Sequence, residues 1–203
     1  MSKVNNIKKL TNTKFLNLFE LEVENKLGTT HPYFISSRKD ETSMIAATGT
    51  TNGDGVLIYS LFGEQNDKVI MVRQFRYAIN DYIYEFPAGL IDPGETATET
   101  AVREMKEETG LDFTPFPCES FLNRPHFSSV GMTDEANSNI YGFAKGTPNL
   151  DLLEPNEDLS IEIVDKEEAR RILKEEYLSV KAYYLLLHFI QSDPTKPFAF
   201  LEI

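Results

Sequence analysis

Residues 96–110 specify the start, the apolar face and the end of one helix by local sequence alone. Thr96 and Glu99 have the spacing of a capping box, in which each residue satisfies a backbone amide of the other. Apolar side chains then recur every four residues, at Ala97, Ala101 and Met105. Gly110 is a natural C-cap. The pattern predicts an amphipathic helix over residues 97–109 that must bury this apolar stripe against another layer.

The remaining periodic segments are mostly β-rich, which narrows the fold class. The expected strands are "FLNLFELEVEN", "HPYFISSRK", "GVLIYSLFG", "KVIMVRQFRY", the start of "DYIYEFPAGLI", "NSNIYGFAKG" and "LSIEIVD". Two further segments, "KEEARRILKEE" and "SVKAYYLLLHFIQS", are helical in pattern. Because these helices do not alternate strictly with the strands, the sequence predicts an α+β fold on a mixed sheet and not a doubly wound one.

The polar face of the 97–109 helix carries three carboxylates. Glu104, Glu107 and Glu108 are related by three and four residues, so they share one face. A charge run is usually a solvated face with weak ion pairs, and Arg103 and Glu107 form such a pair. However, the macrodipole disfavours anions late in a helix. A divalent cation would explain the cluster, and oxygen ligands of this kind suit Mg²⁺ or Mn²⁺ bound together with phosphates.

Composition bounds the partners and the cellular setting. The chain has 203 residues with 41% hydrophobic and 26% charged, which is ordinary for one main domain with a small appendage. The lone Cys118 excludes an internal disulfide. A net charge of −12 repels a nucleic-acid backbone, so no nucleic-acid partner is expected. No apolar run approaches the ~20 residues of a membrane span, so we expect no membrane partner and a soluble, cytoplasmic protein.

The helix and the "GLIDPGE" segment before it share a spacing that resembles the Nudix box, G-x5-E-x7-R-E-U-x-E-E-x-G-U, where U is aliphatic. The matching positions are Gly89, Glu95, Arg103, Glu104, Met105, Glu107, Glu108, Gly110 and Leu111. The resemblance implies an α/β/α sandwich on a mixed sheet. It also implies hydrolysis of a nucleoside diphosphate linked to another group, with Mg²⁺ as cofactor.

The similarity extends beyond the box. "VRQFRYAINDYIYEFPAGLIDPGE" and "EEYLSVKAYYLLLHFIQSDPTKPF" resemble the ADP-ribose and ADP-sugar pyrophosphatase branch of that family. This branch implies a small β-rich dimerisation region over residues 1–45 and a Nudix hydrolase domain over residues 46–203. It therefore implies a homodimer as well.

Site roles follow from the resemblance, position by position. The implied metal ligands are the carbonyl of Ala88 and the carboxylates of Glu104, Glu107 and Glu108. Arg76 would hold the phosphates. Glu95 and Arg103 would orient the box, and Arg103 and Glu107 are counted with the catalytic set.

Hydrolysis of a phosphoanhydride also needs a base for the attacking water. In the resembling branch this base comes from a mobile loop after the box, and "LLEPNEDLSIEIVD" contains the corresponding segment. Glu157 is the first choice, followed by Asp158 and Glu154. Each of these acids could equally be an ordinary solvated loop residue.

The chain departs from the branch where the nucleoside would bind. The Pro-Gly turn that often follows the box has its counterpart in "SSVGMTDE", which makes Gly131 and Met132 candidate substrate residues. Some relatives stack adenine on tryptophan, and this chain has none. Tyr33 and Phe34 are the candidate replacements, and Arg38 would reach the substrate from the partner subunit. These departures bear on the substrate and not on the class of reaction.

The sequence therefore predicts a Mg²⁺-dependent pyrophosphatase for a nucleoside diphosphate sugar. The first candidate substrate is ADP-ribose, which would give AMP and ribose 5-phosphate. Hydrolysis of another nucleoside diphosphate sugar or nucleotide is an alternative. A non-catalytic nucleotide-sugar sensor is a third, although a sensor would not need the complete carboxylate set.

Overall fold

The computed structural model describes residues 1–202, which fold as two compact units. The first unit comprises Met1–Asp54 together with Arg124–Asn137. The second unit comprises Gly55–Asn123 together with the residues from Ser138 onward. The Nudix-box residues all lie in the second unit, whose architecture therefore positions the candidate site.

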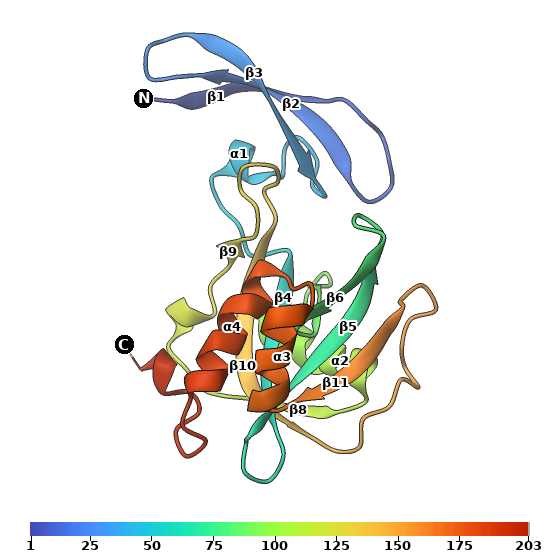
Figure 1. Cartoon of the computed structure of the whole chain (residues 1–203). Coiled ribbons are helices and arrows are strands. Elements are labelled where there is room, and N and C mark those ends of the chain that lie inside the picture. Colours follow the sequence, from blue (N-terminus) through green and yellow to red (C-terminus); the bar gives the residue numbers. More distant parts are fainter. Residues whose placement is uncertain (203) are drawn as a thin grey trace. The chain divides into compact units, whose positions relative to one another are not determined.

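The first unit is built on an antiparallel sheet of three strands in the order β1-β2-β3, drawn in blue in Figure 1. Its elements are β1 (Lys3–Lys9), β2 (Asn17–Glu24), β3 (Thr30–Ser37), α1 (Ile45–Thr48) and β9 (His126–Phe127). Alternate residues of β2, Phe19 and Leu21, are buried against Ile35 and Met44. The polar segment of β1 carries no strand signal of its own, and β1 forms because it pairs with the edge of β2.

The second unit contains a sheet in the strand order β11-β5-β4-β10-β8, with β6 beside β5 and β7 beside β4. The strands are β4 (Gly55–Phe62), β5 (Lys68–Arg76), β6 (Asp81–Glu85), β7 (Ala88–Leu90), β8 (Asp112–Pro115), β10 (Ala136–Lys145) and β11 (Leu159–Val164). Nearly every residue of the central strand β4 is buried, as expected for a strand that is covered on both faces.

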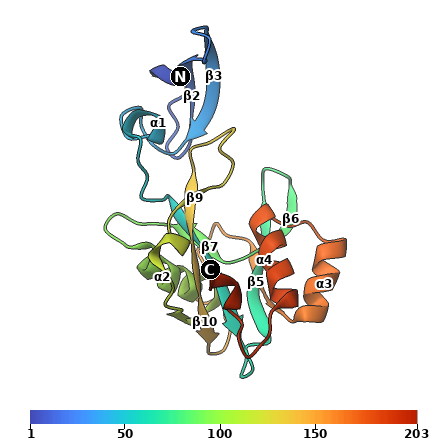
Figure 2. The same ribbon diagram turned by 90° about the vertical axis from the view of Figure 1, so that its left-hand side faces the viewer.

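Helices cover both faces of this sheet. They are α2 (Ala97–Thr109), α3 (Lys166–Glu175) and α4 (Val180–Gln191), with short 3₁₀ turns at Ser120–Leu122 and Ala199–Leu201. Val56 and Ile58 of β4 pack in one core cluster with Met105 of α2. The intervening Leu57 and Tyr59 pack in another cluster with α3 and α4. Figure 2 shows α2 on one side of the strands and α3 and α4 on the other, so the predicted α+β sandwich is confirmed.

The α2 helix has the predicted boundaries and caps. The Thr96 amide donates to Glu99 Oε2 over 2.8 Å, and the Thr96 hydroxyl accepts from the Glu99 amide. Gly110 takes the left-handed conformation at φ +70° and closes the helix. Among residues 1–202, none of the helices has the length and apolar character that crossing a membrane requires.

Candidate active site

The carboxylate face of α2 lies against the short strand β7. Glu108 is 2% exposed, and its Oε2 accepts a hydrogen bond from the Ala88 amide at 3.3 Å. Glu104 lies directly over Gly89, where a Cβ atom added to the glycine would come within 1.9 Å of the Glu104 carboxyl carbon. The Glu104 carboxylate therefore occupies the space of a side chain at position 89, and any residue other than glycine there would displace it.

Arg103 donates hydrogen bonds to three of the four box carboxylates, Glu95, Glu104 and Glu107. Its Nη1 donates to Glu104 Oε1 at 2.8 Å and to Glu107 Oε2 at 2.9 Å. Its Nε and Nη2 both donate to Glu95, which also accepts from the Thr100 hydroxyl at 2.8 Å. These bonds stabilise the charged form of Glu95, and the guanidinium of Arg103 lowers the pKa of that carboxyl to about 2. The geometry agrees with an orienting role for both residues.

A cavity of about 350 Å³ opens beside this network, and we call it the acidic cavity. Its lining residues are Ala88, Gly89, Leu90, Asp92, Arg103, Glu104, Glu107, Glu154 and Glu157. Glu154 and Glu157 come from the segment of residues 146–158 between β10 and β11, which we call the acidic loop. The structure thus brings two of the three candidate bases to the box, from about 50 residues further along the chain.

The negative charge in this region is only partly balanced. Burial, reinforced by neighbouring carboxylates, raises the pKa of Glu104 and of Glu157. The same causes raise the pKa of the more deeply buried Glu108 well above its ordinary value. Arg103 is the one basic residue among those that line the cavity. A bound cation would relieve this repulsion, because an opposite charge favours the ionised form of each carboxyl.

The carboxylate oxygens at this site suit a hard divalent cation, although the carboxylates also accept hydrogen bonds from protein groups. Within residues 1–202, no group of three or more His, Cys, Asp or Glu side chains is gathered in a metal-binding arrangement. Arg103 engages one oxygen each of Glu104 and Glu107, and Glu108 accepts from the Ala88 amide. Carboxylate oxygens are the ligands that Mg²⁺ and Mn²⁺ prefer. The bonds from Arg103 use Oε1 of Glu104 and Oε2 of Glu107, and both residues line the cavity.

Two other predicted residues lie near the cavity without lining it. Arg76 ends β5, and its Nε donates to Glu85 Oε2 at 2.5 Å. The positive charge of Arg76 lowers the pKa values of Glu108 and Glu157, which offsets part of the increase that burial causes. Asp158 accepts a hydrogen bond from the Tyr82 hydroxyl at 2.9 Å. That contact engages the Asp158 carboxylate with β6 and leaves Glu157 and Glu154 as the candidate bases at the cavity.

Apart from Arg76, the predicted substrate residues lie together in the first unit. The Tyr33 hydroxyl donates to the Gly131 carbonyl at 2.7 Å, and the Ser36 amide donates to the Met132 carbonyl at 2.9 Å. Phe34 is about half exposed. Arg38 faces Glu135, with 3.7 Å between Arg38 Nε and Glu135 Oε2. No local pattern indicates the pairing of Tyr33 with Gly131, since they lie 98 positions apart.

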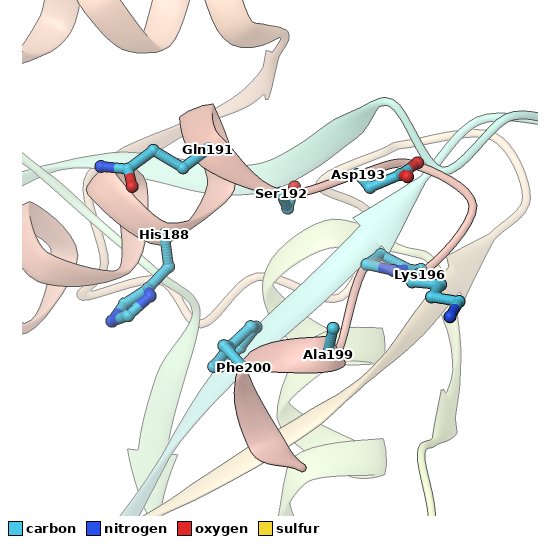
Figure 3. A pocket seen from close by; sticks show the side chains of 8 residues that line it. His188, Gln191, Ser192, Asp193, Lys196, Ala199 and Phe200 are labelled. Atoms are coloured by element: carbon cyan, nitrogen blue, oxygen red, sulfur yellow. The ribbon is translucent and has the colours of Figure 1, made fainter. Parts of the chain in front are cut away.

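A second hollow of about 260 Å³ lies beside the end of α4 (Figure 3). Its lining includes His188, Asp193, Lys196 and Phe200. The His188 ring stacks on Phe200 with 5.1 Å between ring centroids, and Asp193 accepts from the Thr195 amide and hydroxyl. His188 thus serves local packing, and Asp193 serves a turn. The hollow belongs to the α4 side of the sheet, whereas the acidic cavity belongs to the α2 side.

An α+β sandwich with a glycine loop, an arginine-held carboxylate helix and an acidic loop defines a Nudix-type domain. The family profile of the NUDIX domain matches residues 51–187, and the chain therefore belongs to the Nudix family.

Several named proteins are similar to this chain. It is 30% identical over 139 residues to the ADP-ribose pyrophosphatase of Escherichia coli K12, covering 64% of each chain. It is 32% identical over 133 residues to a Caenorhabditis elegans protein assigned to the nudix hydrolases, covering 65% of this chain and 56% of that protein. The matched stretch thus spans between about half and two thirds of the length of these relatives. A crystal structure of an ADP compounds hydrolase superposes with a TM-score of 0.67 over 94% of both chains at 19% identity, which supports the fold.

Proposed function

We propose that this chain hydrolyses the pyrophosphate bond of a nucleoside diphosphate sugar in the presence of Mg²⁺, with Mn²⁺ as a substitute. The carrying observation is the acidic cavity, where the box residues Glu104 and Glu107 meet Glu154 and Glu157 of the acidic loop. ADP-ribose is the proposed substrate, with AMP and ribose 5-phosphate as products. Support comes from the similarity to the E. coli ADP-ribose pyrophosphatase.

The proposed chemistry assigns a task to each group of residues. Glu104, Glu107, Glu108 and the Ala88 carbonyl would hold the cation, which when bound neutralises phosphate charge and lowers the pKa of water. Arg103 keeps the carboxylates oriented through its bonds to Glu104 and Glu107. Arg76 binds phosphate oxygens.

Glu157 is the proposed general base. It lines the acidic cavity, and burial raises the pKa of its carboxyl. A raised pKa makes a carboxylate a better proton acceptor, because the most efficient base has a pKa near the working pH. Glu154 lines the same cavity and is the second choice.

We further propose a homodimer in which the first unit of each subunit contributes to the site of the other. Tyr33 and Phe34 would stack the base, Arg38 would meet a phosphate, and the Gly131–Met132 turn would border the nucleoside. Mixing an Arg38→Ala chain with a Glu104→Gln chain, under subunit exchange, should partly restore activity because one site of the mixed dimer is intact. A monomer in solution, or a mixture no more active than its parents, would exclude this assembly.

The function is tested by a Mg²⁺-dependent hydrolysis screen over nucleoside diphosphate sugars, dinucleotides and nucleoside triphosphates. Release of AMP from ADP-ribose, abolished by chelation and restored by Mg²⁺, is the expected result. Cleavage of nucleoside triphosphates alone would overturn the substrate class. Tight binding of ADP-ribose without turnover, at any Mg²⁺ or Mn²⁺ concentration, would identify a sensor.

A further inference from the structure

The acidic loop is long for a segment without secondary structure, and it is held at both ends by specific contacts. It spans the thirteen residues 146–158 between the end of β10 and the start of β11. Loops of this length inside compact domains are uncommon and are usually functional. An unanchored loop would spread Glu154 and Glu157 over many positions. Their placement at the acidic cavity therefore needs an explanation from the loop's own anchors.

The first anchor joins the end of the loop to the β5–β6 hairpin. The Asp158 carboxylate accepts from the Tyr82 hydroxyl at 2.9 Å, and the Asp158 carbonyl accepts from the Phe75 amide at 2.9 Å. The Tyr82 ring is itself fixed, because it packs 4.5 Å from the Arg73 guanidinium carbon and 5.2 Å from the Phe75 ring centroid. Asp158 directly follows Glu157, so this contact sets the position of the proposed base.

The second anchor joins the start of the loop to the end of α2. The backbone amide of Asn149 donates to the Thr109 carbonyl at 3.0 Å. The Asn149 side chain covers Gly110 so closely that a side-chain carbon at Gly110 would come within 2.3 Å of Asn149 Nδ2. The helix that carries the box carboxylates and the loop that carries Glu157 are therefore joined directly.

A turn between the two anchors couples the two acids. The Glu157 amide donates to the Glu154 carbonyl at 3.0 Å, so both acids move with the same short segment. Hydrogen bonds to charged acceptors are stronger than those between neutral groups, so the exposed bond from Tyr82 to Asp158 adds a side-chain restraint to the backbone bond from Phe75.

We propose that Tyr82 is a positioning residue that clamps the acidic loop and holds Glu157 at the acidic cavity, while the backbone of Asn149 ties the start of the loop to α2. The catalytic part of this inference rests on the proposed function. The clamp itself rests on the contacts above and has a readout that does not need activity. Tyr82 acts through Asp158, and Asn149 acts through the end of α2.

The test begins with Tyr82→Phe, which removes the hydroxyl and keeps the ring on Arg73 and Phe75. Hydrogen exchange of peptides covering residues 146–158 should become about three- to tenfold faster, while exchange in α2 stays unchanged. Tyr77→Phe is the matched control. It also removes a hydroxyl from a tyrosine of the same hairpin, and Tyr77 is 80% exposed. Asp158→Asn, which keeps an acceptor oxygen but loses the charge, should retain more loop protection than Asp158→Ala and less than the wild type.

Kinetics test the positioning role separately. In Tyr82→Phe we expect kcat for the hydrolysed substrate to fall about tenfold with KM within about twofold, because a misplaced base costs transition-state stabilisation and not binding. Unchanged exchange in the loop would overturn the clamp. Faster exchange with unchanged kcat would overturn the positioning role and leave the function standing. A wild-type chain without hydrolytic activity would refute the proposed function, and loop exchange would still decide the clamp.

Discussion

Replacing Gly89 with alanine is the sharpest test of how the site is built. Gly89 has no positive φ, so alanine introduces no backbone strain. Its new carbon would meet the Glu104 carboxyl carbon and Oε1 at 1.9 Å, whereas ordinary contact begins at 3.4 Å. The end of a flexible side chain can move, so the Glu104 carboxylate must shift by about 1.5 Å while the backbone stays in place.

The magnitude follows from that displacement. A misplacement of about 1 Å at a catalytic centre costs roughly 100-fold in rate. We therefore expect Gly89→Ala to lower kcat/KM by about 100-fold, which corresponds to about 2.7 kcal/mol of transition-state stabilisation. Thermal stability should change little, because the clash falls on the Glu104 side chain from Cγ outward and not on backbone atoms.

The assay is Mg²⁺-dependent release of AMP from ADP-ribose, with thermal denaturation measured in parallel. A double variant with Glu104→Gln is the control: if Gly89→Ala acts through Glu104, the double variant should be no worse than Glu104→Gln alone. Near-normal turnover in Gly89→Ala, or losses that simply add in the double variant, would refute the reasoning.

Three further predictions concern the same network and the assembly. Glu104→Gln and Glu108→Gln should each lower kcat at saturating Mg²⁺ by about 100-fold or more, because each removes the charge of a metal ligand. Circular dichroism should show an intact fold in both variants, and near-normal turnover in both would contradict the metal site. The folded-state pKa of Glu95 lies near 2 against an ordinary 4.5, so its contribution to stability is full above pH 4.5 and is lost as the pH falls toward 2. The difference in melting temperature between wild type and Glu95→Gln should therefore shrink over that range, and a difference independent of pH would be contrary to it. Mixed Arg38→Ala and Glu104→Gln chains should regain activity as their subunits exchange, with each variant alone as the baseline.

The sequence by itself determined the local features of this protein. Each local feature of α2 depends on residues within about four positions of each other. These features are its boundaries, its capping box, its glycine C-cap and the shared face of Glu104, Glu107 and Glu108. The apolar runs of residues 56–59 in β4 and 69–72 in β5 were equally predictable, because a strand segment covered on both faces is mostly apolar. The spacing from Gly89 to Leu111 was sufficient to identify the family, which the domain match confirms.

Tertiary structure decided the contacts that bring distant parts of the chain together. The polar segment Lys3–Lys9 became a strand only through its pairing with β2. Three such contacts join residues that lie 39 to 76 positions apart: Glu157 lines the cavity beside the box residues, Tyr82 bonds to Asp158, and Asn149 covers Gly110. Spacing along the chain fixes neighbours within a helix turn or along a strand. Contacts across such separations depend on strand order and on the path of each loop, and neither is set by any local pattern.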